Sequence, residues 1–152
     1  VEDINAFTGK DNKQKTTSKR FRKNGAEIAE LSHYGYFNRF GAICSRTLEL
    51  GENGKEIAGL DAILCEKIYR FDIRFHFAPH VKVSPSIDKK SAIIITNEYG
   101  WNFIYDGDVK LFSEPSIFID DNGKIKKATQ LILTGSTSKK KTEILWGLKR
   151  TN

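Results

Sequence analysis

The segment RFHFAPHVKV, residues 74–83, places two of the chain's three histidines four residues apart. An imidazole can bind a metal, transfer protons or contact a polar ligand, so His76 and His80 are the first candidates for chemistry. A metal site needs three or more converging ligands, and the spacing of Asp72 and the distant His33 does not predict that they join the pair. We therefore expect a structural role for His76 and His80, with contact to a polar ligand as the alternative. We expect neither a metal nor a cofactor in this chain.

The residues around His76 alternate between apolar and polar, as in a strand with one buried face. Pro79 lacks an amide hydrogen and predicts a strand end, a bulge or an edge strand. One face of the expected strand carries Phe71, Ile73, Phe75 and Phe77, and the other carries Asp72, Arg74 and His76. His76 is therefore expected on the polar face, and Pro79 can separate His80 from it.

Short apolar or alternating segments separated by turn residues recur along most of the chain, a pattern typical of an all-β fold. The turns contain Gly, Asn and Asp, which tolerate positive φ, and Asn122-Gly123 is the sharpest hairpin signal. The sequence predicts an antiparallel β-sandwich of roughly nine to eleven short strands with little or no helix. The candidate strands are residues 26–33, 42–50, 56–64, 69–77, 80–84, 91–96, 101–105, 109–113, 115–120, 128–135 and 142–150.

Two of these segments supply large side chains for a core. Their inward faces are expected to carry Trp101, Phe103 and Tyr105, and Ile144, Trp146 and Leu148. A stripe of rings is more often core than a sugar platform, because each ring buries a large apolar area. Arg46 shares the parity of apolar neighbours and needs an acidic or carbonyl partner, for which Asp61 is the candidate. Cys44 and Cys65 are expected to pack as small hydrophobic residues, pairing only if adjacent strands bring them together.

The chain is long enough for one domain with its own core, which we place at residues 26–152. Residues 1–25 are expected to form a basic N-terminal segment. Between Lys10 and Lys23 seven basic residues accompany the single acid Asp11, and the low apolar content predicts a solvated or mobile loop. The alternative is contact with a polyanion, for which the closely spaced basic residues are candidates: Lys19, Arg20, Arg22 and Lys23.

The net charge and the absence of several catalytic and binding motifs reduce the number of functions that the sequence supports. A formal charge of +6 favours anionic partners without naming one. The sequence has no phosphate-binding glycine loop, nucleophile elbow, H-E-x-x-H or mixed Cys and His metal pattern, and no motif that supports nucleic-acid binding. It has no apolar run long enough for a membrane span and no apolar core of a signal peptide; if the parent is exported, we expect its signal to have been cut away. Because it begins at Val1 and contains no methionine, we expect a fragment or a processed chain.

Several segments, in order, resemble the heparinase II/III-like polysaccharide lyases of bacteria. Each motif is short, but their shared order over residues 26–150 makes the resemblance fairly specific. Ser32-His33-Tyr34-Gly35-Tyr36 looks like S-H-D-G-Y, Arg46-Thr47-Leu48-Glu49-Leu50 like R-x-L-x-L, and Gly59-Leu60-Asp61 like G-x-D. The segment from Arg74 to Val81 resembles R-F-H-L-H-P-x-V, and similar motifs match Gly100-Trp101-Asn102-Phe103, Glu114-Pro115-Ser116, Thr129-Gln130 and Trp146-Gly147-Leu148-Lys149-Arg150.

The resemblance implies a parent that cleaves acidic, uronate-containing polysaccharide by β-elimination. Such lyases have an N-terminal helical toroid with a catalytic Asn/His/Tyr group, followed by a β-sandwich with a further histidine motif. None of those motifs lies here, so we expect the C-terminal end of the β region, with no catalytic residues and no activity alone. The alternative is a non-catalytic binding module for anionic polysaccharide. The resemblance also implies a periplasmic or exported location.

The implied partners are an acidic polysaccharide and the parent's toroid, without nucleic acid or a membrane span. The candidate polysaccharide contacts are Lys19, Arg20, Arg22, Lys23, His33, His76 and His80. Two departures from the family pattern bear on these residues. Cys44 stands where the family often has a histidine, and Ala78 stands where the family has the second histidine of its H-L-H-P motif. The second departure weakens a paired role for His76 and His80.

Overall fold

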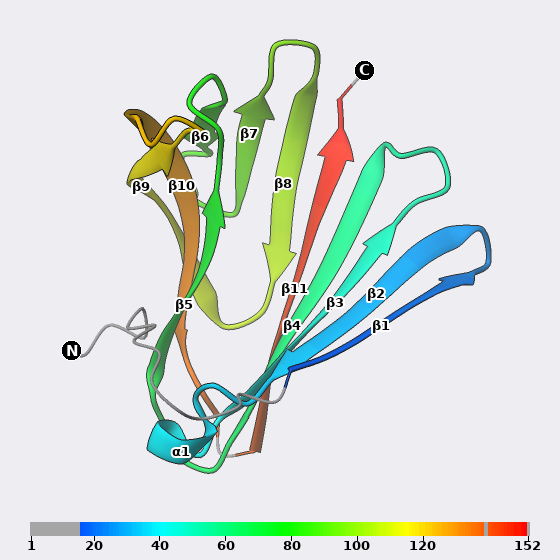
Figure 1. The fold of residues 1–152 in the computed structure, drawn as a ribbon, viewed down its shortest axis with the longest axis vertical. Coiled ribbons are helices and arrows are strands. Elements are labelled where there is room, and N and C mark those ends of the chain that lie inside the picture. The colour runs from blue at the N-terminus through cyan, green and yellow to red at the C-terminus, as the bar shows by residue number, and fades with distance from the viewer. Residues whose placement is uncertain (1–15, 139, 152) are drawn as a thin grey trace.

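The computed structural model describes residues 16–138 and 140–151, which form two antiparallel sheets packed face to face (Figure 1). The larger sheet has the spatial order β1-β2-β3-β4-β11-β8-β7-β6, and the smaller has the order β5-β10-β9. The all-β prediction is confirmed, and the helix α1 has four residues. The elements are β1 Thr16–Lys23, β2 Ala26–His33, α1 Phe37–Phe40, β3 Ile43–Leu50, β4 Glu56–Cys65, β5 Arg70–His76, β6 Lys82–Pro85, β7 Ser91–Ile95, β8 Gly100–Asp106, β9 Val109–Ile119, β10 Ile125–Ser136 and β11 Lys140–Arg150.

The prediction of a loop over the second half of Lys10–Lys23 is wrong, because residues 16–23 form strand β1. This strand pairs with β2 along its whole length, from Thr16 opposite His33 to Lys23 opposite Ala26. The turn between them is Asn24-Gly25, with φ of 49° and 82°, and this dipeptide is strongly favoured in two-residue hairpin turns. Cross-strand hydrogen bonds therefore order a basic segment whose composition alone indicated a loop. Residues 1–15 of the expected N-terminal segment lie outside the described residues.

Strand β9 is another difference from the expected strands. The sequence predicted two strands on either side of Glu114, whereas one strand runs through Pro115, which stands opposite Thr129 of β10. Strand β9 is the outer strand of the three-stranded sheet, and an edge position tolerates proline because one side of the strand needs no amide donor. The proline therefore marks an edge strand rather than a strand end.

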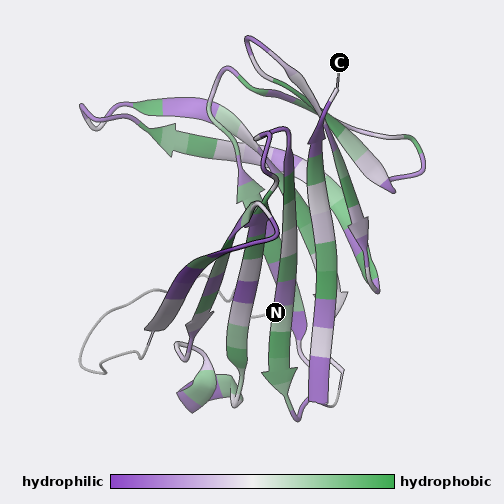
Figure 2. Ribbon diagram, turned by 90° about the vertical axis from the view of Figure 1, so that its right-hand side faces the viewer, coloured by the Kyte–Doolittle hydropathy of each residue, from purple (hydrophilic) through white to green (hydrophobic). Residues whose placement is uncertain are grey.

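The core lies between the sheets and uses the residues that the alternation predicted. Hydrophobic and hydrophilic residues form alternating bands along the strands (Figure 2). Phe103 and Leu131 are fully buried, and Phe75 packs edge-on against Trp146 with ring centroids 4.9 Å apart. The cluster also contains Phe71, Ile73, Ala92, Ile94, Leu111, Leu133 and Ile144. Burying this apolar area is the main source of stability in such a domain.

The two sheets differ in width, and the smaller one does not cover all of the larger one. Strands β1, β2 and β3 extend away from the three-stranded sheet as one side of an open V (Figure 1). Leu31 and Leu50, on the inward face of this extension, remain 41% and 42% exposed. No helix among the described residues is long and apolar enough to cross a membrane.

Candidate functional site

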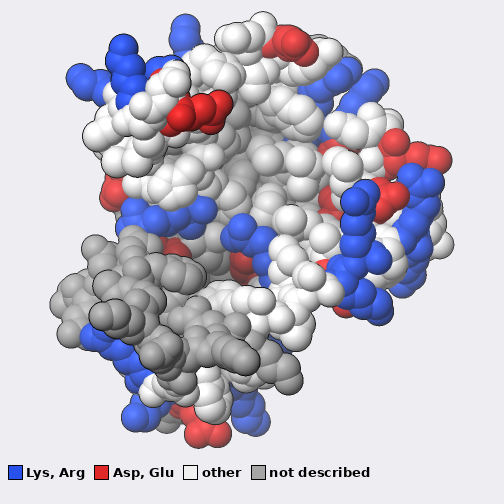
Figure 3. All heavy atoms as spheres, viewed as in Figure 1, with Lys and Arg blue, Asp and Glu red and all other residues white. Residues whose placement is uncertain are grey.

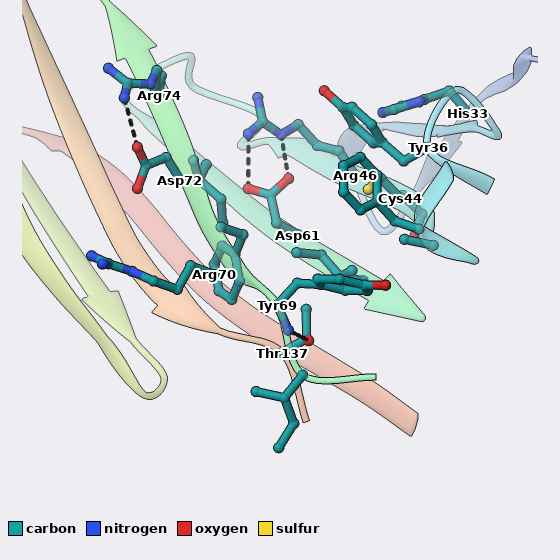
Figure 4. Close-up of a pocket in the computed structure, with 18 residues that line it drawn as sticks. His33, Tyr36, Cys44, Arg46, Asp61, Tyr69, Arg70, Asp72, Arg74 and Thr137 are labelled. Carbon is teal, nitrogen blue, oxygen red and sulfur yellow. Dashed lines mark hydrogen bonds and ion pairs between the residues drawn. The ribbon is translucent and has the colours of Figure 1, made fainter. Parts of the chain in front are cut away.

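A cleft of about 530 Å³ opens between β5 and the inward face of β3 and β4. The end of β2, the turn with α1 and the loop before β5 complete its walls, so it gathers residues from far apart in the sequence (Figure 4). Its volume is in the range of small-ligand sites. Its polar lining includes the side chains of His33, Tyr36, Arg46, Asp61, Asp72 and Arg74.

A partly buried ion pair forms one wall of the cleft. Arg46 donates from Nε to Asp61 Oδ1 at 2.6 Å and from Nη2 to Oδ2 at 2.9 Å. Trp146 Nε1 donates to the same Oδ2 at 2.8 Å, and the Arg46 guanidinium lies 5.6 Å from the Phe75 ring centroid and 5.5 Å from that of Trp146. The predicted pairing of Arg46 with Asp61 is confirmed. It holds β3 and β4 together where their register places the two residues opposite each other.

His33 and its neighbours form the end wall of the cleft. The Gly35 N–H donates to His33 Nδ1 at 3.3 Å, which assigns the proton of the neutral ring to Nε2. The Tyr36 ring meets the imidazole edge-on, 5.2 Å between centroids. Burial lowers the pKa of His33 and raises the pKa of Tyr36. The pKa of the Cys44 thiol is raised to about 11, mainly by burial and to a smaller extent by the nearby Asp61 and Cys65. This cysteine is therefore neutral and a poor nucleophile.

His33 should make stability depend on pH. Its pKa in the folded chain lies below the reference value of 6.5, so the unfolded chain binds the proton more tightly. The folding stability that the neutral His33 ring contributes is fully present above pH 6.5, and it is lost as the pH falls through the pKa of His33 in the folded chain. We expect urea titrations between pH 5 and pH 8 to show a drop in unfolding free energy below pH 6.5, and His33→Gln should reduce that drop. A matched His80→Gln variant that reduced it equally would contradict the assignment to His33.

Strand β5 forms the opposite wall. Arg74 donates from Nη2 to Asp72 Oδ2 at 2.6 Å, and its Nη1 lies 3.7 Å from Glu114 Oε2. Thr134 Oγ1 donates to Asp72 Oδ1 at 2.7 Å. Arg70, at the start of the strand, is exposed and makes no hydrogen bond or ion pair within the described part of the chain. Asp72 and Arg74 share the outer face of the smaller sheet with His76, so they make the rim of the β5 wall polar. Phe71, Ile73 and Phe75 on the inner face are apolar.

The structure does not bring the three histidines together. His33 lies in the cleft, whereas His76 is on the outer face of the smaller sheet, with Nδ1 2.9 Å from Ser116 Oγ. His80 is exposed in the loop between β5 and β6. Within residues 16–138 and 140–151 there is no group of three His, Cys, Asp or Glu that could hold a metal ion. Cys44 and Cys65 lie on neighbouring strands as free thiols.

The four basic candidates lie on β1, the outer strand of the larger sheet. Figure 3 shows Lys and Arg gathered over the β1–β2 hairpin, with acidic side chains among them. Arg20 and Arg22 both donate to Glu27, at 3.2 and 2.9 Å. These contacts lower the pKa of Glu27, and the hydrogen bond from Arg20 has the largest effect. Lys19 lies 4.7 Å above the Phe21 ring centroid on the other face of the strand. Glu27 therefore offsets part of the charge of the two arginines, whereas Lys19 and Lys23 keep theirs exposed.

The sequence reasoning missed the cleft itself. Tyr36, Tyr69, Arg70 and Thr137 line it, but they come from a short turn, two loops and a strand start, and their spacing carries no common pattern. The available signal was the resemblance of three segments, residues 32–36, 46–50 and 59–61, to family motifs, because His33, Tyr36, Arg46 and Asp61 all line the cleft. Of the predicted contacts, only His33 lines this cleft.

Comparison with known proteins identifies the fold. The crystal structure of heparan sulfate lyase HepC from Pedobacter heparinus matches with a TM-score of 0.77 at 10% identity, covering 91% of this chain and 22% of that one. The heparinase III BT4657 gene product matches with a TM-score of 0.74 at 9% identity, and the match covers 90% of this chain and 21% of that one. The 4-alpha-glucanotransferase from Thermococcus litoralis matches with a TM-score of 0.54 at 14% identity, and the match covers 88% of this chain and 22% of that one. The chain thus spans about a fifth of the length of these structures.

A search of curated protein sequences finds no significant match. The profile of one protein family, described as "Heparinase II/III-like, C-terminal", matches residues 3–147. This match covers nearly the whole chain and agrees with the β-sandwich of the heparinase structures. The chain belongs to the heparinase II/III-like C-terminal domain family.

Proposed function

We propose that this chain is the C-terminal accessory β-domain of a polysaccharide lyase. In this proposal the parent cleaves acidic, uronate-containing polysaccharide, its N-terminal helical toroid carries the catalytic group, and the protein is exported or periplasmic. Family membership supports this reading. The similar structures include a heparan sulfate lyase, and they are several times longer than this chain.

We further propose that the chain alone does not catalyse β-elimination. That reaction needs a base that removes a proton, a group that neutralises the uronate carboxylate, and an acid that protonates the leaving oxygen. Tyr36 and His33 share the cleft with Arg46, but burial disfavours the phenolate of Tyr36. His33 uses Nδ1 for the Gly35 amide, and Arg46 is held by Asp61. These contacts support a structural role for the cleft side chains.

The binding part of the proposal is contact with anionic polysaccharide through the β1–β2 hairpin. One observation carries it: β1 presents Lys19, Arg20, Arg22 and Lys23 on eight residues that contain no acid. Exposed contacts of this kind are individually weak and sensitive to salt, so the hairpin would add to the parent's hold on its substrate. A free-standing binding module is the second candidate, and it would use the same surface.

Chromatography on immobilised heparin tests this binding role. We expect the Lys19→Gln/Lys23→Gln variant to elute at a lower salt concentration than the unchanged chain. It removes the two lysines of β1, which are exposed and have no acidic partner within hydrogen-bond distance among the described residues. The matched control is Lys55→Gln/Lys127→Gln, which removes the same charge from exposed positions in the β3–β4 turn and on β10. An equal shift for both variants would show that only net charge matters and would overturn the assignment to β1.

A further inference from the structure

One edge of strand β5 has no strand partner among the described residues, and that edge faces the cleft. Within residues 16–138 and 140–151 the strand pairs only with β10, and it ends the three-stranded sheet. The cleft is lined on this side by residues 70–74. An open strand edge presents a row of N–H and C=O groups that can pair with another chain segment.

The ladder with β10 shows which backbone groups face the cleft. The Thr137 N–H donates to the Tyr69 carbonyl at 2.8 Å, and the Phe77 N–H donates to the Thr129 carbonyl at 3.0 Å. The register between these two points is continuous, so odd-numbered residues of β5 direct their backbone groups to β10 and even-numbered residues direct theirs away from it. Within the described chain, the N–H groups of Arg70, Asp72 and Arg74 therefore have no backbone partner.

The neighbouring sheet face is also incomplete. Leu31 and Leu50 are more than two-fifths exposed on the inward face of β2 and β3, and Leu31 lies opposite Arg46, which lines the cleft. Adjacent strands are spaced by about 4.8 Å, so a strand added at the β5 edge would extend the smaller sheet over this uncovered part of the larger one. It would make main-chain hydrogen bonds on one side and apolar contacts below.

We propose that the β5 edge accepts a further β-strand supplied by the rest of the same protein. The inference rests on the proposed function, in which this chain is one domain of a longer polypeptide, as the one-fifth coverage of the similar structures supports. The strand carries an apolar residue at every second position, facing the larger sheet. An acidic side chain near its contact with Arg70 complements that guanidinium group, which has no acidic partner among the described residues.

Two other occupants fit this edge less well. In a second copy paired antiparallel through β5 and centred on Asp72, that aspartate would face itself and Arg70 would face Arg74, and like charges directly opposite each other are destabilising. A carbohydrate can fill the cleft volume, but the unpaired N–H groups recur at every second residue of an extended chain, which is the repeat of a β-strand. The geometry therefore favours a polypeptide strand.

Amide hydrogen exchange of residues 70–76 tests the proposal by comparing this chain with the whole protein. We expect the amides of Arg70, Asp72 and Arg74 to exchange at least about tenfold more slowly in the whole protein, because strand pairing protects them. The amides that already pair with β10 serve as the internal control. Equal rates for the three amides in both proteins would overturn the proposal. Protection that rises with the concentration of the 1–152 chain would show self-pairing and would overturn the proposed source of the strand.

A matched pair of substitutions locates the hydrogen bonds. Arg70→Pro removes one N–H that faces the cleft, at the first residue of a strand, where proline is tolerated. Arg70→Gln removes the same side chain and keeps the N–H. In the whole protein we expect Arg70→Pro to speed exchange at Asp72 and Arg74 and Arg70→Gln to leave it slow. Equal behaviour of the two variants would contradict strand addition, whereas heparin retention through β1 would be unaffected, so the two proposals fail separately.

Discussion

Asp61→Ala is expected to lower the free energy of unfolding of the chain by about 3 kcal/mol, because it leaves a partly buried guanidinium without its counter-charge. Asp61 is 8% exposed and accepts two hydrogen bonds from Arg46 and one from Trp146. The substitution removes all three acceptor contacts at once. Arg46 keeps about a third of its side chain exposed, which places the cost at the lower end of the range for a broken buried pair. Urea unfolding at pH 7 measures it.

Two controls separate the ion pair from a general effect of losing a carboxylate. Asp61→Asn keeps an oxygen that can accept from Trp146 and removes the charge, so its cost should fall between those of the unchanged chain and Asp61→Ala. Asp108→Ala alters an exposed residue in the β8–β9 turn and should change stability by less than about 0.5 kcal/mol. A loss below about 1 kcal/mol for Asp61→Ala would mean that the pair is effectively solvated.

Gly59→Ala is expected to be equally damaging for a steric reason. Gly59 is buried on β4 directly opposite Trp146, and a Cβ added there would overlap the six-membered ring of the indole. The indole packs against Phe75 and Phe103, and Nε1 of its five-membered ring donates to Asp61, so the side chain cannot move without disturbing the core. We expect a loss of about 3 kcal/mol in urea unfolding, at the upper end for overpacking.

Gly147→Ala is the matched control for this substitution. Gly147 lies on β11 next to Trp146, but its nearest neighbour for an added Cβ is the Ile57 carbonyl at 3.7 Å, an ordinary van der Waals distance. The same change of residue should therefore cost less than about 1 kcal/mol there. Similar losses at both positions would show that glycine matters for its backbone rather than for the space that Trp146 occupies.

The sequence predicted those parts of the fold that follow from local alternation. The faces of β5, β8 and β11 were predicted correctly because side-chain direction in a strand repeats every two residues. The partner of Arg46 followed from the same parity. Strand β1 was missed because the prediction rested on polar composition and took no account of Asn24-Gly25, a dipeptide that is a strong hairpin signal when alternating segments flank it.

The cleft depends on strand order, which local patterns do not reveal. Strands β4 and β5 are consecutive in sequence, yet they belong to different sheets. This change of sheet creates both the cleft wall and the open β5 edge. Nothing in the residues around Arg70 distinguishes a strand that continues the first sheet from one that begins the second. The turn before α1 likewise reaches the cleft only through the pairing of β2 with β3.

The absorbance of unsaturated uronate product most directly tests whether this domain supports a lyase without performing its chemistry. The folded chain, residues 1–152, would be incubated with heparan sulfate and its ultraviolet absorbance followed over time. We predict no increase above that of the polysaccharide alone. A steady increase that disappears in His33→Ala, with the fold intact, would contradict the account and place a catalytic site in the cleft.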